Sequence, residues 1–228
     1  SLEDNTTGTH NTASGYYSLG DNTTGTYNTA SGYYAMRYAT TANDYNIAIG
    51  RNAMRGPAAG YTSSDYNIAI GESALYSIDG SLSGGDYNVA VGRNSLYNNT
   101  TGTSNTAVGS KALYTNTTGD YNTAVGYLAG SSSTGEGNVF LGHKAGYYET
   151  GDNKLHIANT DSKTLIWGDF DKDSVVIYGD LHITGTVNYT ETDPIFGASV
   201  ANGITAIDTA NWNNHTVDTQ LDAAGGTR

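Results

Sequence analysis

Residues 105–109 read Asn-Thr-Ala-Val-Gly, and this five-residue pattern, Asn-x-Ala-x-Gly, recurs through the first two thirds of the chain. The copies begin at Asn11, Asn28, Asn46, Asn67, Asn88, Asn105, Asn122 and Asn138. Their start-to-start spacings are 17, 18, 21, 21, 17, 17 and 16 residues, and only Phe140 departs from the central Ala. A sequence that repeats at such intervals predicts a stacked array of similar units.

Each repeat reads as a short strand, a tight turn, a second short strand and a variable loop. In residues 105–109 β-branched side chains alternate with Ala, which predicts a strand that the glycine ends. An apolar pair such as Ala112-Leu113 follows three residues after most motif glycines, and we interpret it as the second strand. Residues 115–119, Thr-Asn-Thr-Thr-Gly, have the composition of a loop.

These elements predict an all-β fold, a parallel β-roll or β-solenoid with eight repeats. Strands this short do not form a stable isolated sheet, and no segment carries the 3.6-residue period of a helix. In a β-solenoid each repeat makes one coil, and the coils hydrogen-bond to one another about 4.8 Å apart. Eight coils would form a rod about 40 Å long at that spacing.

Stacking gives each motif position a role. Positions two and four share one face of the strand, so the Ala between them faces the other way. Because this residue is Ala in seven of the eight copies, we expect it to face a wall too close for a larger side chain, either the opposite strand or another subunit. The Gly supplies a positive φ for the turn, and the Asn bonds to the backbone of its own or an adjacent turn as a ladder. The structural repeat residues are Asn46, Ala48, Gly50, Asn67, Ala69, Gly71, Asn88, Ala90, Gly92, Asn105, Ala107, Gly109, Asn122, Ala124 and Gly126.

The composition argues against several classes of function. The chain of 228 residues holds 30 Gly and 19 Tyr but is only 37% hydrophobic, so each repeat must bury a little and its neighbours the rest. Its net charge of −12 argues against nucleic acid and anionic membranes as partners. It has no Cys, and no apolar run approaches the ~20 residues of a membrane span, so we expect no membrane insertion in this segment. The chain opens with Ser rather than Met, and we interpret it as part of a longer protein.

Changes of pattern divide the chain into three regions. Residues 1–150 form the repeat head, residues 151–187 a β neck or cap, and residues 188–228 a linker with a short helical connector. A neck is expected because a repeat array needs a cap at its end. Its predicted strands are residues 154–158, 164–167, 174–178 and 181–184.

A column of tyrosines is the candidate ligand-binding surface. The residue before the motif Asn is Tyr27, Tyr45, Tyr66, Tyr87 or Tyr121 in five of the repeats. Stacked coils would arrange these rings as a ladder of flat amphipathic groups, which suits contact with proteins and sugars. The alternative, and the more frequent role, is that the rings cover the roll or pack between subunits, since Tyr is also a preferred strand residue.

Carboxylates form a second column, two residues before the motif Asn. They are Asp44, Asp65, Asp86 and Asp120. Like charges about 4.8 Å apart repel, so the column needs either solvation, which we expect, or a cation. Residues 169–180 also place Asp where an EF-hand loop has ligands, but they lack its Gly at position six and its closing Glu. We interpret that segment as an acidic turn and predict no metal site.

The sequence does not predict an enzyme. Its five His residues show no metal-ligand spacing, and it has neither a Gly-x-Ser-x-Gly elbow nor a Cys nucleophile. A carbohydrate-active enzyme on a β-helix would need converging carboxylates, for which we find no spacing. We expect no catalysis and no cofactor.

Threonine pairs leave a different function open, an ice- or surface-binding β-solenoid. The pairs that lie in an Asn-Thr-Thr-Gly loop are Thr6-Thr7, Thr23-Thr24, Thr100-Thr101 and Thr117-Thr118. A flat Thr array would need such a pair on every coil, and four of the eight coils lack this loop. Ice or crystal-surface binding is therefore the alternative hypothesis.

The NTAVG and NIAIG motifs, followed by x-x-Ala-Leu and Asn-Thr-Thr-Gly, resemble the head repeat of YadA-type trimeric autotransporter adhesins. Related repeats occur in phage tail fibres and in the fibres of contractile injection systems. The likeness covers residues 4–147 and implies a left-handed parallel β-roll, with three rolls side by side in a homotrimer. Residues 155–187 and 190–200 are similar, more loosely, to the region after such repeats in fibre-like surface proteins. The insertions around Pro57 and Ser81 depart from the shorter YadA-type repeat.

Repeat, motif absences and resemblance together predict a structural or adhesive fibre segment without catalysis. On this hypothesis the chain is a trimeric surface adhesin or a tail-fibre-like receptor-binding protein. It would be extracellular, on a cell surface or a phage-like particle. Its partners would be further copies of itself and a cell-surface protein, matrix or glycan receptor.

Overall fold

The structure of the chain is a computed structural model, and it describes residues 1–58, 61–79 and 84–179. This described part consists of strands and turns, with no α-helix and with a short 3-10 helix at Phe170–Lys172. The all-β prediction is confirmed. The strand expected at residues 181–184 and the helical connector expected within 188–228 lie outside the described residues.

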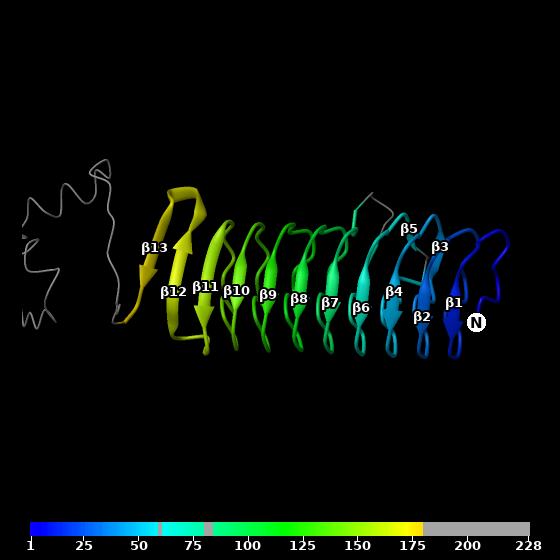
Figure 1. Cartoon of the computed structure of the whole chain (residues 1–228), viewed down its shortest axis with the longest axis horizontal. Helices are drawn as coiled ribbons and strands as arrows, with labels where there is room; N and C mark the ends of the chain where they lie inside the picture. The colour runs from blue at the N-terminus through cyan, green and yellow to red at the C-terminus, as the bar shows by residue number, and fades with distance from the viewer. Residues whose placement is uncertain (59–60, 80–83, 180–228) are drawn as a thin grey trace, which may run out of the picture. The chain divides into compact units, whose positions relative to one another are not determined.

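The eight motif copies form strands of three residues that follow one another in one sheet (Figure 1). They are β1 (Thr12–Ser14), β2 (Thr29–Ser31), β4 (Ile47–Ile49), β6 (Ile68–Ile70), β7 (Val89–Val91), β8 (Thr106–Val108), β9 (Thr123–Val125) and β10 (Val139–Leu141). Neighbouring strands pair in parallel and motif on motif, so that Ala107 lies opposite Ala124. The predicted parallel β-solenoid, with one coil per repeat, is confirmed. The left-handed sense and the trimer stay predictions.

The longer repeats keep this register because their extra residues lie outside the main sheet. β3 (Ala39–Thr41) and β5 (Tyr61–Thr62) form a separate parallel pair. The strands on either side of these insertions still pair position by position, with Ile47 opposite Ile68 and Ile68 opposite Val89. Insertions at one edge are the usual way in which a solenoid tolerates length variation.

The second element of each repeat is a run of turns, which corrects the prediction of a second strand. The Ala112 amide donates to the carbonyl oxygen of Gly109 in the same turn (3.2 Å), whereas the Leu113 amide donates to the carbonyl oxygen of Ala129 in the next coil (3.0 Å). Leu113 has a φ of 49°, in the left-handed region, which no strand residue adopts. Bonds within and between coils therefore alternate, and the turns stack on one another as strands would.

The same left-handed conformation recurs at one buried apolar position in each of the first six coils, with φ between 47° and 51°. These residues are Leu19, Met36, Met54, Leu75, Leu96 and Leu113. The left-handed conformation costs an L-residue about 1–2 kcal/mol, but full burial of a Leu or Met side chain contributes about 1.5–3 kcal/mol. Burial thus offsets the strain, and the strain is tolerated only inside a stacked array.

The motif glycines have the positive φ that was predicted, from 112° at Gly142 to 141° at Gly32. Their neighbours impose a second requirement. A Cβ at Gly50 would lie 2.5 Å from the carbonyl oxygen of Gly71 in the next coil. Any side chain there would push adjacent coils apart, so Gly is needed for stacking as well as for the turn.

The motif alanines line the inside of the coil. Ala48, Ala69, Ala90 and Ala107 are fully buried and belong to one core cluster with the Leu and Met rungs. Positions two and four of each motif face outward and are half-buried or exposed. The predicted orientation is confirmed, and the close wall is the opposite side of the same coil rather than another subunit.

Phe140, the one motif residue larger than Ala, is accommodated by two glycines. Gly130 and Gly146 occupy the positions that Leu or Met takes in the earlier coils, and a Cβ at either would collide with the Phe140 ring. Both glycines keep the left-handed φ of the replaced residues, 56° and 58°. A large side chain on one wall has thus been exchanged for large side chains on the other.

Beyond the repeats the sheet continues into the predicted neck. β11 (Lys154–Ala158) pairs in parallel with β10, and β12 (Thr164–Asp169) and β13 (Ser174–Ile177) add to it in antiparallel (Figure 1). These are three of the four strands expected in the neck. The direction of the chain reverses after β11, so that the regular coiling ends there.

Candidate functional site

The predicted tyrosine ladder is present and forms a continuous stack over four coils, extended by His10. Ring centroids are 4.6 Å apart between His10 and Tyr27, 4.8 Å between Tyr27 and Tyr45, 4.9 Å between Tyr45 and Tyr66, and 5.1 Å between Tyr66 and Tyr87. The interplanar angles are 2–7°. Because stacking covers both faces of the inner rings, only their edges and hydroxyls can contact a ligand.

The backbone fixes this ladder in place. Tyr27, Tyr45, Tyr66 and Tyr87 all have φ of 58–59°, again in the left-handed region. Their amides donate to carbonyl oxygens of the preceding coil at 3.1 Å. The rings are about half exposed, 47% at Tyr45 and Tyr66. Partial burial between its neighbours Tyr45 and Tyr87 raises the pKa of Tyr66, so its phenol stays neutral at physiological pH.

Tyr121, the fifth predicted residue, stands apart from the stack. The intervening coil carries Ser104 at the ladder position, and the coil after Tyr121 carries Gly137. Tyr121 makes no ring contact within the described part of the chain, and at 68% it is the most exposed of the five. Tyr87, which ends the stack, is 59% exposed. The structure therefore joins four of the predicted tyrosines and leaves the fifth isolated across a gap.

The carboxylate column is held by backbone amides. The Asp65 carboxylate accepts a hydrogen bond from the Asp44 amide (2.7 Å), and the Asp86 carboxylate accepts one from the Asp65 amide (2.8 Å). Asp120 accepts from both the amide and the hydroxyl of Thr103 (2.7 and 3.1 Å). These carboxylates are half-buried, so solvation alone, as expected from the sequence, does not describe them. Burial, and then the charges of its neighbours Asp86 and Asp44, raise the pKa of Asp65 even though the Asp44 amide lowers it.

The motif asparagines form the predicted ladder inside the coil. Each motif Asn is fully buried from Asn28 onward, and its side-chain oxygen accepts a hydrogen bond from the backbone amide of the next motif Asn. For example, the Asn122 amide donates to the side-chain oxygen of Asn105 (2.9 Å). The side-chain amide of Asn105 donates to the carbonyl oxygen of Gly119 (2.8 Å). The last rung, Asn138, receives the amide of Lys154, which leads into β11 (2.8 Å). These residues support the coils and are not accessible to a ligand.

A second aromatic row, which the sequence reasoning missed, follows the buried Leu and Met rungs. Its members are Arg37, Arg55, Tyr76, Tyr97 and Tyr114. Ring centroids lie 4.9 Å apart between Tyr76 and Tyr97 and 5.2 Å apart between Tyr97 and Tyr114. The Arg37 guanidinium lies 4.4–4.8 Å from the ring centroids of Tyr17, Tyr34 and Tyr38. A count of residues from each motif Gly would have found this row, but a search by residue type does not, because the type changes from Arg to Tyr.

The outer face of the sheet carries a strip of apolar side chains. Its exposed members, between 37% and 46% exposed, are Ile47, Ile49, Ile70, Val108, Val125 and Leu141. Half-buried members between them are Ile68, Val89, Val91 and Val139. The first two coils have Thr and Ser at these positions. The strip thus begins at β4 and runs in register to β10.

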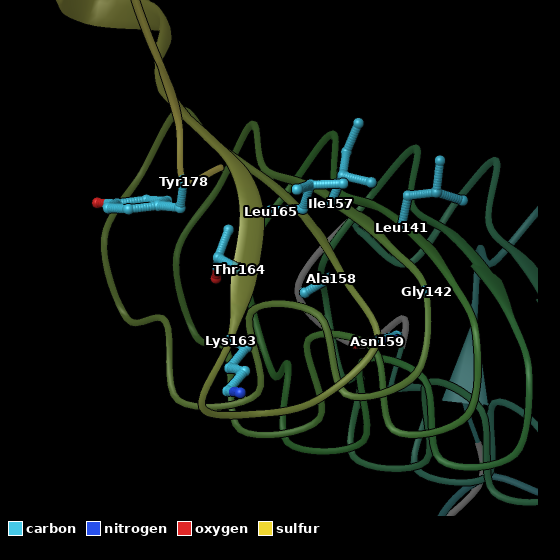
Figure 2. A pocket seen from close by; sticks show the side chains of 9 residues that line it. All are labelled: Leu141, Gly142, Ile157, Ala158, Asn159, Lys163, Thr164, Leu165 and Tyr178. Atoms are coloured by element: carbon cyan, nitrogen blue, oxygen red, sulfur yellow. The ribbon is translucent and has the colours of Figure 1, made fainter. Parts of the chain in front are cut away.

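A shallow apolar hollow of about 510 Å³ lies at the end of this strip (Figure 2). Leu141 and Ile157, which are register partners on β10 and β11, gather with Leu165 at one end of it, and Lys163 lies at the opposite end in this view. Lys163 is its one charged lining residue among the described residues. The hollow therefore continues the apolar strip, and the residues up to Gly179 that line it do not include the convergent acids and bases of a catalytic cleft.

Ionisable side chains close the end of the core. His156 follows Phe140 on the inner face, and its Nε2 lies 2.9 Å from the Glu149 carboxylate. Burial alone would raise the pKa of Glu149, but the Gly151 amide and His156 outweigh burial and lower it. Asp169, 2% exposed, lies 2.9 Å from the Lys172 ammonium and 3.1 Å from that of Lys154, and these cations hold its pKa below the usual value.

Both oxygens of the Asp169 carboxylate are thus paired with lysine ammonium groups, which would compete with a calcium ion. Within the described residues no group of three or more His, Cys, Asp or Glu side chains is placed to hold a metal ion. Asp180, the last member of the EF-hand-like spacing, lies outside them. Nor does the described part contain a helix long and apolar enough to cross a membrane.

Comparison of the chain with protein-family models, curated proteins and solved structures finds no match in any of the three.

Proposed function

We propose that the chain is a structural and adhesive fibre segment, a homotrimeric surface adhesin or tail-fibre-like receptor-binding protein. The observation that carries this proposal is the apolar strip on the outer face of the sheet. A large exposed apolar surface marks an interaction site. Because the strip repeats once per coil, a second copy lying side by side would meet it rung for rung.

Cyclic symmetry is the usual solution for a soluble homo-oligomer, and the resemblance to YadA-type heads favours three copies. Three rolls around one axis would each turn the strip inward and leave the tyrosine ladder for recognition. On this proposal the molecule is extracellular, on a cell surface or a phage-like particle. We propose no catalytic step for it.

The assembly is tested with a triple variant, Ile49→Thr, Ile70→Thr and Val91→Thr. Thr keeps a β-branched side chain, and the first two motif strands already carry hydroxyl side chains at both outward positions, so each coil is expected to fold. Sedimentation equilibrium should give a trimer for the native chain and a monomer for the variant, with circular dichroism unchanged. A matched control, Tyr45→Ser, should stay trimeric. A native chain that is monomeric at tens of micromolar would overturn the trimer.

The recognition role is tested separately, by binding of the labelled chain to a glycan array and to surfaces coated with matrix proteins. We expect saturable binding that the pair Tyr45→Ser and Tyr66→Ser weakens at least tenfold without a change in oligomeric state. Absence of binding throughout, or binding that the pair leaves unchanged, would argue against the tyrosine surface.

The alternative of ice binding finds no support in the Thr pairs. The hydroxyls of Thr6, Thr23 and Thr100 donate to backbone carbonyl oxygens of the next coil at 2.8–3.0 Å. These hydroxyls form hydrogen bonds between neighbouring coils instead of an outward-facing array. A dilute solution of the chain should accordingly show no thermal hysteresis.

A further inference from the structure

The tyrosine ladder lacks one ring between Tyr87 and Tyr121, and this one-coil gap is called the slot below. Tyr87 and Tyr121 occupy equivalent positions two coils apart, with Ser104 on the coil between them. Ser104 has the same left-handed backbone, φ 56° against 58° for both tyrosines. Its amide bonds to the Asp86 carbonyl oxygen (3.0 Å), as the tyrosine amides do one coil earlier. The backbone of the ladder is therefore intact, and only the ring is missing.

The width of the slot suits one planar group. Rings on adjacent coils of the ladder lie 4.6–5.1 Å apart. Two coil spacings separate Tyr87 from Tyr121, about 10 Å, since neighbouring strands are about 4.8 Å apart. A flat group inserted over Ser104 would stack on both rings at the spacing that the ladder itself uses. These are the two most exposed rings of the column, at 59% and 68%.

The charge around the slot favours a cation. Asp86 and Asp120 directly precede the two rings in the chain, and Thr103 replaces the Asp between them. The column carries no Lys or Arg at either the carboxylate or the ring position, and the chain has a net charge of −12. A tyrosine face attracts a cation within about 6 Å of its centroid. A planar cation would thus gain from both rings and from the Asp120 carboxylate, which is hydrogen-bonded to Thr103 beside Ser104.

The chain already uses such a group as a rung. Arg37 begins the second aromatic row, and its guanidinium lies 4.4–4.8 Å from the centroids of three tyrosine rings beside that row, those of Tyr17, Tyr34 and Tyr38. Arg55, at the next rung, lies 5.6 Å from the centroid of Tyr76, the ring that follows it. Guanidinium and phenol groups therefore occupy equivalent positions of successive coils, first Arg37 and Arg55 and then the three tyrosines of the row.

We propose that the slot between Tyr87 and Tyr121 binds the guanidinium group of an arginine side chain presented by a protein partner. This inference rests on the proposed function, because it assumes that the chain binds a receptor and names the receptor group that the slot would hold. Arg is preferred to Lys because a planar guanidinium stacks on both faces, whereas an ammonium is a strongly hydrated point charge.

The test measures binding of Nα-acetyl-arginine amide to the full chain labelled with ¹³C in its tyrosine rings. The probe should shift the Tyr87 and Tyr121 ring resonances saturably, with a dissociation constant in the millimolar range, and spare those of Tyr45 and Tyr66. The lysine analogue and the neutral Nα-acetyl-tyrosine amide should bind at least threefold more weakly. The variant Ser104→Tyr fills the slot and should weaken the arginine probe at least tenfold, whereas Ser104→Ala should not.

Ser104→Tyr is expected to fold, because tyrosine occupies the same backbone conformation at Tyr45 and Tyr66, and an unchanged melting temperature verifies it. Three results would each overturn the slot: no saturable shift, a shift that survives Ser104→Tyr, or equal affinity for the lysine or tyrosine probe. None of them depends on trimerisation. A chain that trimerises and adheres but fails here loses only the slot, and a monomeric chain that passes loses only the trimer.

Discussion

At the scale of single residues, the two sides of a motif strand differ sharply in the room that they leave. Ala107 is fully buried against the Leu and Met rungs, whereas Thr106 lies on the outer face. Ala107→Leu must overpack the core, which typically costs about 1–3 kcal/mol. Thr106→Val changes an outward side chain and should stay within about 0.5 kcal/mol. Urea denaturation of the two variants should separate them clearly, and equal midpoints would contradict the packing.

Phe140 offers a second test, because its space is set by two glycines. Phe140→Ala leaves a cavity between Gly130 and Gly146 and should cost about 3–5 kcal/mol, the usual range for a buried Phe. Adding Gly130→Leu and Gly146→Leu restores the pattern of the earlier coils and should recover most of the loss. Gly130→Leu alone, with Phe140 in place, should destabilise. A triple variant no more stable than Phe140→Ala would show that the exchange is not one of volume.

At the scale of the elements, the periodicity of the sequence predicted what repetition can reveal. Alternation located all eight motif strands, and the invariant Asn and Gly predicted the ladder and the positive φ. The prediction of a second strand was wrong because an apolar pair of residues is compatible both with a strand and with a stacked turn. The residue types of Ala112-Leu113 do not indicate a left-handed backbone at Leu113. That conformation is stabilised by burial of the Leu113 side chain in the core and by the hydrogen bond of its amide to the next coil.

The candidate site shows the same division. Spacing alone predicted the column that holds Tyr45 and Tyr66, and the missing ring at Ser104 is readable from the sequence. The contact of Arg37 with its three rings is not, because side-chain reach across coils depends on rotamers. Likewise nothing in the sequence indicates that the Asp44 amide of the preceding coil donates a hydrogen bond to the Asp65 carboxylate.

The element that closes the core makes stability sensitive to acid. Glu149 has a pKa below its ordinary value of 4.5, so its contribution to stability is present above that pH and is lost as the pH falls through the lowered pKa. Glu149→Gln should therefore lower the melting temperature at pH 7, and its difference from the native chain should shrink towards pH 3. Thermal melts between pH 7 and pH 3 measure this. A constant difference would mean that the carboxylate is not the source.

The carboxylate column should show the opposite sign. The pKa of Asp65 is raised above 3.8, so the stability of the folded chain falls as the pH rises through that raised pKa. Asp65→Asn keeps an oxygen that can accept the Asp44 amide and removes the charge. It should raise the melting temperature slightly at pH 7 and have no effect below pH 3.8. A loss of stability at neutral pH would indicate that the amide needs a charged acceptor.

At the scale of the whole molecule, the inter-coil backbone hydrogen bonds of the described residues join each coil to the coils before and after it. In such an array stability is close to a sum over repeats and their interfaces, so removal of one whole coil should be tolerated. Deleting residues 105–121 joins Ser104 to Asn122. The Asn122 amide can then donate a hydrogen bond to the side-chain oxygen of Asn88, in place of the Asn105 amide. A fall in Tm of a few degrees is expected, since about 1 kcal/mol shifts Tm by about 2–4 °C in a chain of this size.

A deletion that ignores the coil is the matched control. Removing residues 113–121 takes out only nine residues, but the chain would then reach Asn122 after half a turn, and the Asn ladder and the inward Ala row could not stay in register. Circular dichroism and thermal melts should show a cooperative, folded protein for the 17-residue deletion and loss of the transition for the shorter one. If the shorter deletion were the milder, chain length rather than coil register would govern stability, and one-dimensional stacking would be wrong. The stacked coil is therefore the unit in which this molecule can be shortened, and by the same reasoning lengthened.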